Sequence, residues 1–140
     1  MRWMKAIITA EMIGNDIIQK IEEISGENIY KCYQCGKCTA GCPAAGEMDM
    51  GPAEAIRLLQ LGLVEKVLQS RAIWYCASCI MCYNRCPKGV DFSKIAEACR
   101  MILLRSGVSK IEVNDFDPEY RKKAPQIAMI SCARKFSSLS

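Results

Sequence analysis

The sequence predicts an all-α domain whose helices surround two cysteine-rich loops. One cysteine string, Cys-x2-Cys-x2-Cys-x3-Cys-Pro, occurs at residues 32–43 and again at residues 76–87. Beside and between the strings, apolar residues recur at helical spacing. The length of 140 residues, 51% of them hydrophobic, suits one small domain. We expect an N-terminal extension with the first helix at 1–25, the cysteine-rich helical domain at 26–107, and a linker and docking tail at 108–140.

The first predicted helix runs from about Asn15 to Ile24. Asn15 is a suitable N-cap, and Gly26 is a suitable C-terminal stop. Four isoleucines form one apolar stripe along this segment: Ile17, Ile18, Ile21 and Ile24.

The cysteine strings come next, and their spacing is typical of proteins that hold 4Fe-4S clusters. A cubane cluster needs four converging thiolates, and each C-x2-C-x2-C loop supplies three. In the bacterial two-cluster pattern the fourth cysteine of each string ligates the other cluster. We therefore expect two 4Fe-4S clusters, with Pro43 and Pro87 turning the chain away after each fourth cysteine. The predicted ligands are Cys32, Cys35, Cys38 and Cys86 for the first cluster, and Cys76, Cys79, Cys82 and Cys42 for the second.

The spacer between the strings, residues 44–74, is predicted to be helical. Pro52 suits a first helical turn, and Gly62 is expected to divide the segment into two helices that end near Ser70. The apolar residues at helical spacing are Ala53, Ile56, Leu59 and Leu63. A third helix is predicted from about Ser93 to Arg105, with Gly107 after its end. Its expected inward residues are Ile95, Ala96, Cys99, Ile102 and Leu103.

Structural zinc and disulfides are the alternatives for so many cysteines. Zinc uses four ligands at each site and has no use for a third evenly spaced cysteine. Disulfides require an oxidising compartment. Because Arg2, Lys5 and Glu11 interrupt any apolar run in the first 14 residues, we expect no secretory leader and a cytoplasmic location.

The net charge does not predict nucleic-acid binding. The formal charge of +4 counts the cysteines as neutral thiols. Eight ligating thiolates and two oxidised cores of about +2 each bring the total close to zero. No aromatic and basic groove pattern is present, and no stretch is long enough to span a bilayer. We expect neither a nucleic-acid partner nor a direct membrane span.

Several residues near the strings have two interpretations. Gly36 and Gly41 either bring backbone amides close to the cluster or serve as turn glycines. Lys37 and Lys88 either stabilise a reduced cluster or are solvated lysines. Four aromatic residues are expected to pack around the clusters and shield them from water: Tyr33, Trp74, Tyr75 and Tyr83.

The remaining cysteines and the chain ends carry weaker signals. Cys99 is expected to be an inert buried side chain, and Cys132 an incidental thiol. The tail has acidic and then basic residues, followed by the apolar run 127–130. We interpret it as a segment that contacts a partner, with a frayed terminus as the alternative. The segment 3–12 invites the same interpretation.

The residues around the cysteines point to one family more specifically than the cysteine spacing alone does. The stretches in question are KCYQCGKCTAGCP at 31–43, AIR at 55–57, LGL at 61–63 and WYCASCIMCYNRCPKGV at 74–90. Over about residues 26–107 they resemble the C subunit of heterodisulfide reductase, an alpha-helical ferredoxin-type protein. Iron-sulfur subunits of succinate dehydrogenase and glycolate oxidase share the helical module but match less well around the first string.

The resemblance implies an electron-relay subunit of a soluble oxidoreductase that acts on sulfur groups. Electrons would pass from a flavin-containing A-type subunit, through this chain, to a B-type subunit that has Cys-Cys-Gly motifs and handles the disulfide. This chain has no Cys-Cys pair, so we assign it no catalytic residue and no substrate site. The alternative functions are a free two-cluster ferredoxin, or the iron-sulfur subunit of another dehydrogenase of the succinate dehydrogenase or glycolate oxidase type. A zinc-binding structural module is a further alternative.

Overall fold

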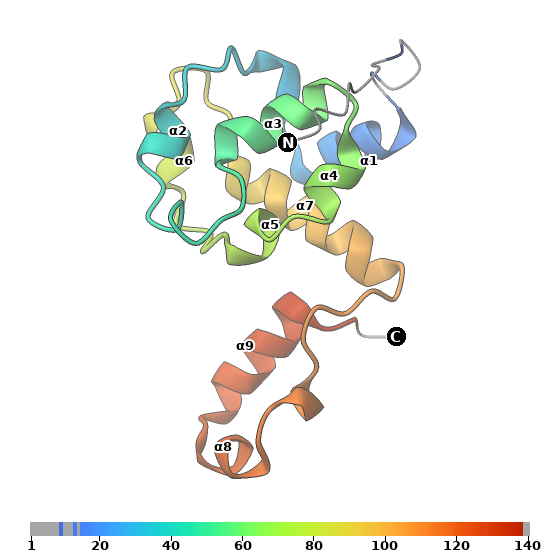
Figure 1. The fold of residues 1–140 in the computed structure, drawn as a ribbon, viewed down its shortest axis with the longest axis vertical. Helices are drawn as coiled ribbons and strands as arrows, with labels where there is room; N and C mark the ends of the chain where they lie inside the picture. The colour runs from blue at the N-terminus through green and yellow to red at the C-terminus, as the bar shows by residue number, and fades with distance from the viewer. Residues whose placement is uncertain (1–8, 10–12, 14, 139–140) are drawn as a thin grey trace, which may run out of the picture.

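The computed structural model describes residue 9, residue 13 and residues 15–138. All regular secondary structure in this part of the chain is helical, which confirms the predicted all-α class. Seven α-helices form a rounded domain, and two more form an arm that extends from it (Figure 1). The α-helices are α1 (Asp16–Ser25), α2 (Lys37–Ala40), α3 (Pro52–Gln60), α4 (Val64–Leu68), α5 (Ala72–Tyr75), α6 (Met81–Arg85), α7 (Phe92–Arg105), α8 (Pro118–Lys123) and α9 (Gln126–Phe136). The described residues also form two 3-10 turns, η2 (Ile29–Lys31) and η3 (Val113–Asp115).

Helix α1 has the predicted boundaries and caps. The Asn15 side chain accepts a hydrogen bond from the Ile18 N–H at 3.0 Å, which satisfies one of the free donors at the helix start. Gly26 follows the helix with a φ of 68°, a conformation that glycine adopts without steric cost. Ile18 and Ile21 are fully buried against α7, whereas Ile17 and Ile24 lie at the edge of the core.

The spacer is helical from Pro52 onward, with Pro52 in the first turn of α3. Gly62, at a φ of 76°, separates α3 from α4, as predicted. Residues 44–51 are turns and bends instead of the predicted helix, and the Asp49 carboxylate in this loop caps the start of α5. It accepts hydrogen bonds from the N–H groups of Arg71 and Ala72 at 2.9 and 3.0 Å. These hydrogen bonds lower the pKa of Asp49, although burial acts in the opposite direction.

Helix α7 is the longest helix of the described residues and packs against α1, α4, α5 and α6. Asp91 caps it, and Gly107 follows its end with a φ of 84°. The predicted inward residues Ile95, Ala96 and Cys99 are fully buried, while Ile102 and Leu103 are partly buried. Burial of a large aliphatic or aromatic side chain stabilises the fold by about 1.5–3 kcal/mol. The core residues of this size with at most 2% exposure are Ile18, Ile21, Ile29, Ile56, Leu59, Ile73, Phe92 and Ile95.

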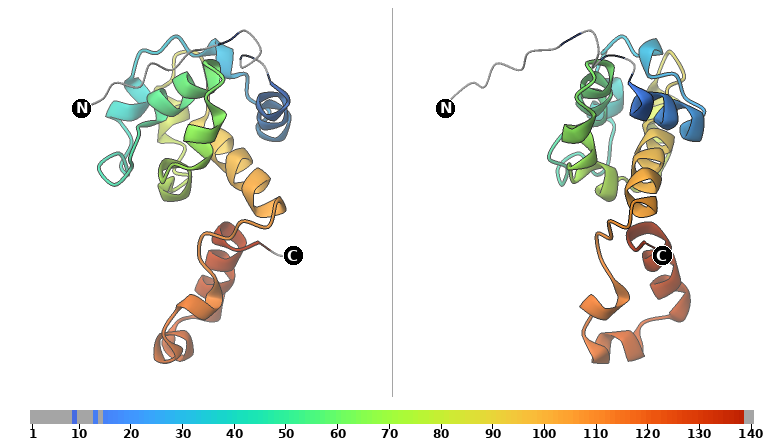
Figure 2. Two further views of the ribbon diagram at one scale, coloured as in Figure 1. Left: turned by 45° about the vertical axis from the view of Figure 1, so that its right-hand side comes forward. Right: turned by 90° about the vertical axis from the view of Figure 1, so that its right-hand side faces the viewer.

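The C-terminal arm, residues 108–138, is more ordered than a linker. The chain runs from the end of α7 to α8 at the far end of the arm, and α9 then leads back toward the domain (Figures 1 and 2). The return is fixed by hydrogen bonds from the N–H groups of Lys110 and Ile111 to the Phe136 carbonyl, at 2.8 and 3.3 Å. The predicted contact segment 3–12 lies outside the described residues except for residue 9. No helix in the described ranges is long and apolar enough to cross a membrane.

Candidate iron-sulfur site

Cysteines from both strings line two separate cavities. The first cavity encloses about 330 Å³ of space free of protein atoms, part of it open to solvent. Its lining includes three cysteines of the first string and the last cysteine of the second. These are Cys32, Cys35, Cys38 and Cys86. The residues around them include Tyr33, Gly36, Ile56, Lys88 and Val90.

The second cavity has the reverse composition and nearly the same size, about 320 Å³. Three cysteines come from the second string and the last one from the first, namely Cys76, Cys79, Cys82 and Cys42. Its other walls are mainly apolar, with Pro43, Pro52, Ile80, Met81 and Phe92 among them. The two groups of four therefore match the predicted crossed ligand sets, and we call them the first and second cysteine groups.

The chemistry of these groups fits iron-sulfur clusters. All ten cysteines are free thiols. Within the described residues, no three Cys, His, Asp or Glu side chains converge closely enough to hold one metal ion. The four cysteines of each group line the wall of one cavity. Four converging thiolates are the ligand set of a 4Fe-4S cluster. The assignment of each cysteine as a ligand stays a prediction.

The two strings repeat the same backbone conformation. The residue before the second cysteine has a positive φ in both strings, 65° at Gln34 and 53° at Ser78. The residue after that cysteine does as well, 75° at Gly36 and 62° at Ile80. Each of these turns starts a short helix, α2 or α6, that carries the third cysteine. The left-handed conformation is rare for a β-branched residue, so Ile80 holds local strain that Gly36 does not.

Hydrogen-bond donors surround the first cysteine group. The Gln34 side-chain amide donates to the Cys32 sulfur at 3.4 Å, and the Val90 N–H donates to the Cys86 sulfur at 3.3 Å. The Lys37 N–H lowers the pKa of Cys35, with a further contribution from the Tyr33 hydroxyl. Donors directed at thiolate sulfur stabilise negative charge there, so this group is adapted to hold additional negative charge.

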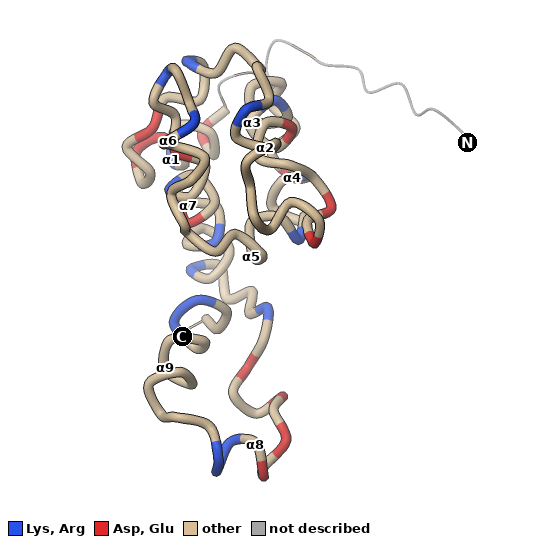
Figure 3. Tube along the Cα trace, turned by 90° about the vertical axis from the view of Figure 1, so that its left-hand side faces the viewer, with Lys and Arg blue, Asp and Glu red and all other residues tan. Residues whose placement is uncertain are grey.

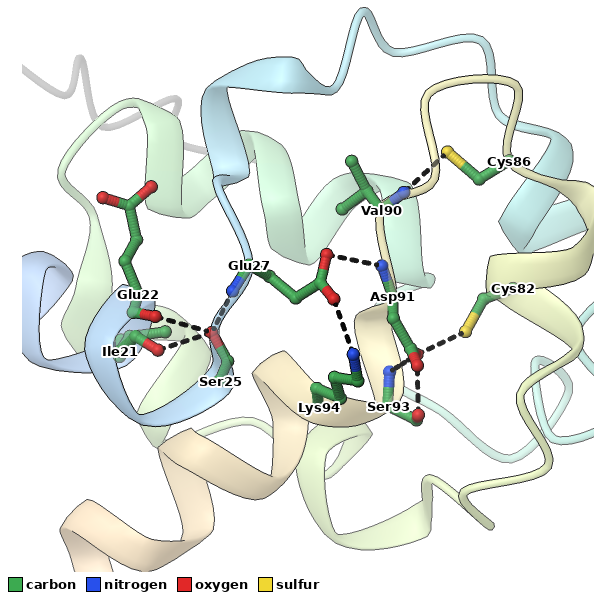
Figure 4. Close-up of polar contacts among 10 residues, drawn as sticks. All are labelled: Ile21, Glu22, Ser25, Glu27, Cys82, Cys86, Val90, Asp91, Ser93 and Lys94. Atoms are coloured by element: carbon green, nitrogen blue, oxygen red, sulfur yellow. Dashed lines mark hydrogen bonds and ion pairs between the residues drawn. The ribbon is translucent and has the colours of Figure 1, made fainter.

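A buried carboxylate distinguishes the second group. Asp91, 4% exposed, lies 3.6 Å from the Cys82 sulfur and accepts hydrogen bonds from the N–H and hydroxyl of Ser93 at 2.8 and 2.6 Å (Figure 4). Burial raises the pKa of the Cys82 thiol to about 11, and the negative charge of Asp91 adds to this effect. The Asp91 N–H donates to Glu27, whose other oxygen pairs with Lys94 at 3.0 Å. This network fixes the start of α7 beside the cavity.

Helix α2 packs closely against α6 and α3, which holds the strings together. The absence of a side chain at two glycines, Gly41 and Gly51, makes these close contacts possible. A Cβ atom at Gly41 would lie 2.3 Å from the Arg85 side chain, so Gly41 makes room for Arg85. A Cβ atom at Gly51 would lie 2.5 Å from Thr39, whose hydroxyl accepts a hydrogen bond from the Ala53 N–H at 3.0 Å. Gly36 has open space around it and adopts its left-handed φ without the steric cost that a side chain would add.

The aromatic residues divide into two classes. Trp74 is 5% exposed and stacks on Phe136 with ring centroids 5.9 Å apart. The three tyrosines, Tyr33, Tyr75 and Tyr83, are each about half exposed at the surface. Tyr33 lines the first cavity, whereas Trp74, Tyr75 and Tyr83 are not among the lining residues of either cavity. The expected shielding role of the four residues stays a prediction.

The other singled-out residues are placed as follows. Cys99 is fully buried, as predicted, and burial raises the pKa of its thiol to about 12. Cys132 is partly buried on α9, outside both cavities. Lys88 lies at the wall of the first cavity with its side chain exposed. Sequence reasoning missed Gln34, Asp91 and Lys135, because a hydrogen bond to a sulfur or to a cysteine carbonyl leaves no spacing signal.

Comparisons with known proteins agree with this geometry. Residues 28–90, which include both strings, match the family model described as a 4Fe-4S dicluster domain. The iron-sulfur C subunit of the CoB–CoM heterodisulfide reductase from Methanopyrus kandleri is 32% identical over 109 residues, 72% of this chain and 57% of that protein. The C 2 iron-sulfur subunit of the CoB–CoM heterodisulfide reductase from Methanocaldococcus jannaschii is 38% identical over 97 residues, 66% of this chain and 52% of that protein.

A third relative has a related name. The C2 subunit of the H2/formate:CoB–CoM heterodisulfide,ferredoxin reductase from Methanococcus maripaludis is 35% identical over 108 residues, 74% of this chain and 58% of that protein. The chain therefore spans a little more than half the length of these relatives.

The helical fold, the two cysteine groups and the matched domain define an iron-sulfur protein of the 4Fe-4S dicluster class. Over the segment shared with its relatives, the chain belongs to the family of heterodisulfide reductase iron-sulfur C subunits.

Proposed function

We propose that this chain is the electron-transfer subunit of a cytoplasmic heterodisulfide-reductase-like complex and holds two 4Fe-4S clusters. The observation that carries the proposal is the division of the string cysteines into two groups of four, each drawn from both strings. Such clusters supply reversible one-electron chemistry when bound. The chain would hold them with the first group Cys32, Cys35, Cys38 and Cys86 and the second group Cys76, Cys79, Cys82 and Cys42.

The role of the protein is to fix the cysteines and set the charge around them. The packing of α2 against α6 brings the strings together, and the fourth cysteine of each string then reaches the other group. This crossing joins the two groups into one unit. The N–H donors at the first group and the Asp91 carboxylate at the second give the groups different surroundings.

We assign the disulfide chemistry to other subunits. A flavin-containing A-type subunit would donate electrons, and a B-type subunit with Cys-Cys-Gly motifs would hold the thiol and disulfide site. The names of the relatives support a subunit role, since each is the C or C2 component of a reductase. This chain would need no catalytic residue of its own.

The arm offers a surface for such a partner. Ile127 is 71% exposed and Ile130 55% exposed on α9, and Tyr120 is 57% exposed on α8. Exposed apolar residues this close together on an extended arm indicate a protein contact. We assign this surface to one of the partner subunits of the same complex.

The test is an anaerobic pull-down of the full chain from its native host, with identification of the proteins that co-purify in stoichiometric amounts. The proposal predicts a flavoprotein and a Cys-Cys-Gly protein. Substitution of Ile127 and Ile130 by Asp should release at least one of them, whereas Lys122→Met, a matched change on the same arm, should not. Recovery of the iron-loaded chain alone would support the free-ferredoxin function, and zinc in place of iron would refute both.

A further inference from the structure

The C-terminal end of α9 touches the polypeptide at the second cysteine group. Lys135 donates a hydrogen bond from its ammonium group to the Cys76 carbonyl at 2.9 Å. The next residue, Phe136, stacks on Trp74, two positions before Cys76. The basic residues of α9 lie in its last turn, at the end that faces the domain (Figure 3). Residues 59 positions apart in sequence are thus joined at a predicted ligand.

A second cation acts on the same segment. Arg100 of α7, only 6% exposed, donates a hydrogen bond to the Ile73 carbonyl. The Ile73 carbonyl in α5 therefore accepts a hydrogen bond from the Arg100 guanidinium, and the carbonyl of the C-cap residue Cys76 accepts one from the Lys135 ammonium group. Both contacts lie where the chain enters the second cysteine group. Arg100 and Lys135 also line a common cavity between α7 and α9, together with Arg134, Glu97 and Ser78. Cations at the carboxyl end of a helix stabilise it electrostatically.

The partial burial of Lys135 strengthens its electrostatic interaction with Cys76. The side chain is partly buried, and burial, together with the nearby Arg100, lowers its pKa, while the charge of Cys76 acts in the opposite direction. The ammonium group thus interacts with negative charge on Cys76 in a medium that screens less than bulk water. A reduced cluster carries one more negative charge than an oxidised one, so a fixed cation beside it favours reduction.

We propose that Lys135 tunes the reduction potential of the cluster held by the second cysteine group, raising it through the charge that α9 places against Cys76. The inference rests on the proposed function, because it needs an iron-sulfur cluster at this group. Lys135 is a positioning and electrostatic residue, not a ligand. One electron enters from the donor subunit, and Lys135 neither gains nor loses a proton in the step.

The arrangement links the potential to the arm. Lys135 and Phe136 are at one end of α9, and the exposed residues Ile127 and Ile130 are toward the other. A partner that binds at Ile127 and Ile130 therefore binds the same helix that carries Lys135. The Trp74–Phe136 stack and the hydrogen bonds to the Phe136 carbonyl hold the end of α9, and with it Lys135, against the domain.

The experiment is an anaerobic redox titration of the full chain, followed by electron paramagnetic resonance, with Lys135→Met compared with Lys135→Arg and Lys122→Met. Lys135→Met removes the charge at nearly constant size. One of the two midpoint potentials should fall by about 59 mV, a tenfold change for a one-electron couple, and the other should not move. Lys135→Arg should restore most of the potential. Lys122→Met removes an equal charge from α8 and should leave both potentials unchanged.

Phe136→Ala supplies an independent variant. It keeps the lysine but removes the stack that holds it, so the same midpoint should fall. The inference is overturned if Lys135→Met leaves both potentials unchanged, if both move equally, or if Lys135→Arg shifts as far as Lys135→Met. A wild-type chain without iron and labile sulfide would instead refute the proposed function, so the two failures are distinguishable.

Discussion

The two cysteine groups share one spacing and one backbone turn but lie in different surroundings. The first group has N–H donors on its sulfurs, with the half-exposed Tyr33 and the exposed Lys88 at its walls. In the second group, Cys76 and Cys82 are 7% and 8% exposed, the walls are mainly apolar, and Asp91 faces a sulfur. The motif thus predicts which residues hold a cluster, and we expect the neighbouring residues to determine how readily each cluster accepts an electron.

This difference predicts an order of reduction. Hydrogen bonds and solvent stabilise added negative charge at the first group. At the second group the Ser93 and Phe92 N–H groups also donate to Cys82, but burial and the Asp91 carboxylate outweigh them and raise the pKa of this thiol. Lys135 compensates for part of this penalty. We expect the first cluster to have the higher potential, so that an electron entering the chain comes to rest there.

The largest effect is expected from replacing the crossed cysteines. Cys42→Ser should remove or convert the cluster held mainly by the second string, and Cys86→Ser the cluster held mainly by the first. Iron analysis and electron paramagnetic resonance of the two variants should show complementary losses. If each serine damages the cluster of its own string, the crossed assignment is wrong.

The Asp91 carboxylate should have the next largest effect. Asp91→Asn keeps the size and one acceptor oxygen for Ser93 but removes the charge beside Cys82. The potential of the second cluster should rise by about 59 mV, a tenfold change for a one-electron couple. A redox titration should show the midpoint that Lys135→Met lowers moving in the opposite direction. Movement of the other midpoint would contradict the assignment of Asp91 to the second group.

The equivalent positions 36 and 80 allow a direct comparison of the two turns. Gly36→Ala places a Cβ in the left-handed region and should destabilise the fold by about 1 kcal/mol, since the space around it is open. Ile80→Gly relieves a similar strain but adds flexibility, so the free energy of unfolding should change by less than about 1 kcal/mol. Chemical denaturation of both variants, without oxygen, measures the two changes.

The functional consequence of Ile80→Gly should be greater than its effect on stability. Ile80 lines the second cavity, and its loss opens that cavity to solvent. Exposure to air should bleach the second cluster faster in the variant, as followed by visible absorbance, with the first cluster serving as the internal control. Equal bleaching of both clusters would show that Ile80 does not cover the site.

The smallest effect is expected at Gln34. Gln34→Asn keeps a residue that tolerates a positive φ but shortens the side chain, so the hydrogen bond to the Cys32 sulfur is lost. The potential of the first cluster should fall by about 30 mV, which is about 0.7 kcal/mol for a one-electron couple and lies within the roughly 0.5–1.5 kcal/mol that one hydrogen bond contributes. A shift in the second midpoint would place Gln34 at the wrong group.

Much of the fold could be predicted from local signals. Asn15, Pro52, Gly62 and Gly107 lie where a cap, a first turn or a stop was expected, because each acts on its own backbone. The cavity linings agree with the crossed ligand sets expected from the repeated motif, and the ligand assignment itself stays a prediction. These features depend on a few neighbouring residues and therefore leave a pattern in the sequence.

The unpredicted features depend on residues far apart in the chain. Asp49 caps α5 from more than 20 residues away, and residues 44–51 form a loop instead of a helix. Gly41 makes room for Arg85, although the sequence indicated only a turn or a residue that faces the cluster. The tail forms helices α8 and α9 whose return depends on Phe136 meeting Trp74. Contacts of this kind have no fixed spacing and become visible only in three dimensions.

The most direct test of the central claim is a count of iron and acid-labile sulfide in the chain purified without oxygen. Two 4Fe-4S clusters predict about eight of each per chain, with the signal of a 4Fe-4S centre on reduction. Zinc without sulfide would contradict the account, and so would about four of each, because one cysteine group would then hold no cluster.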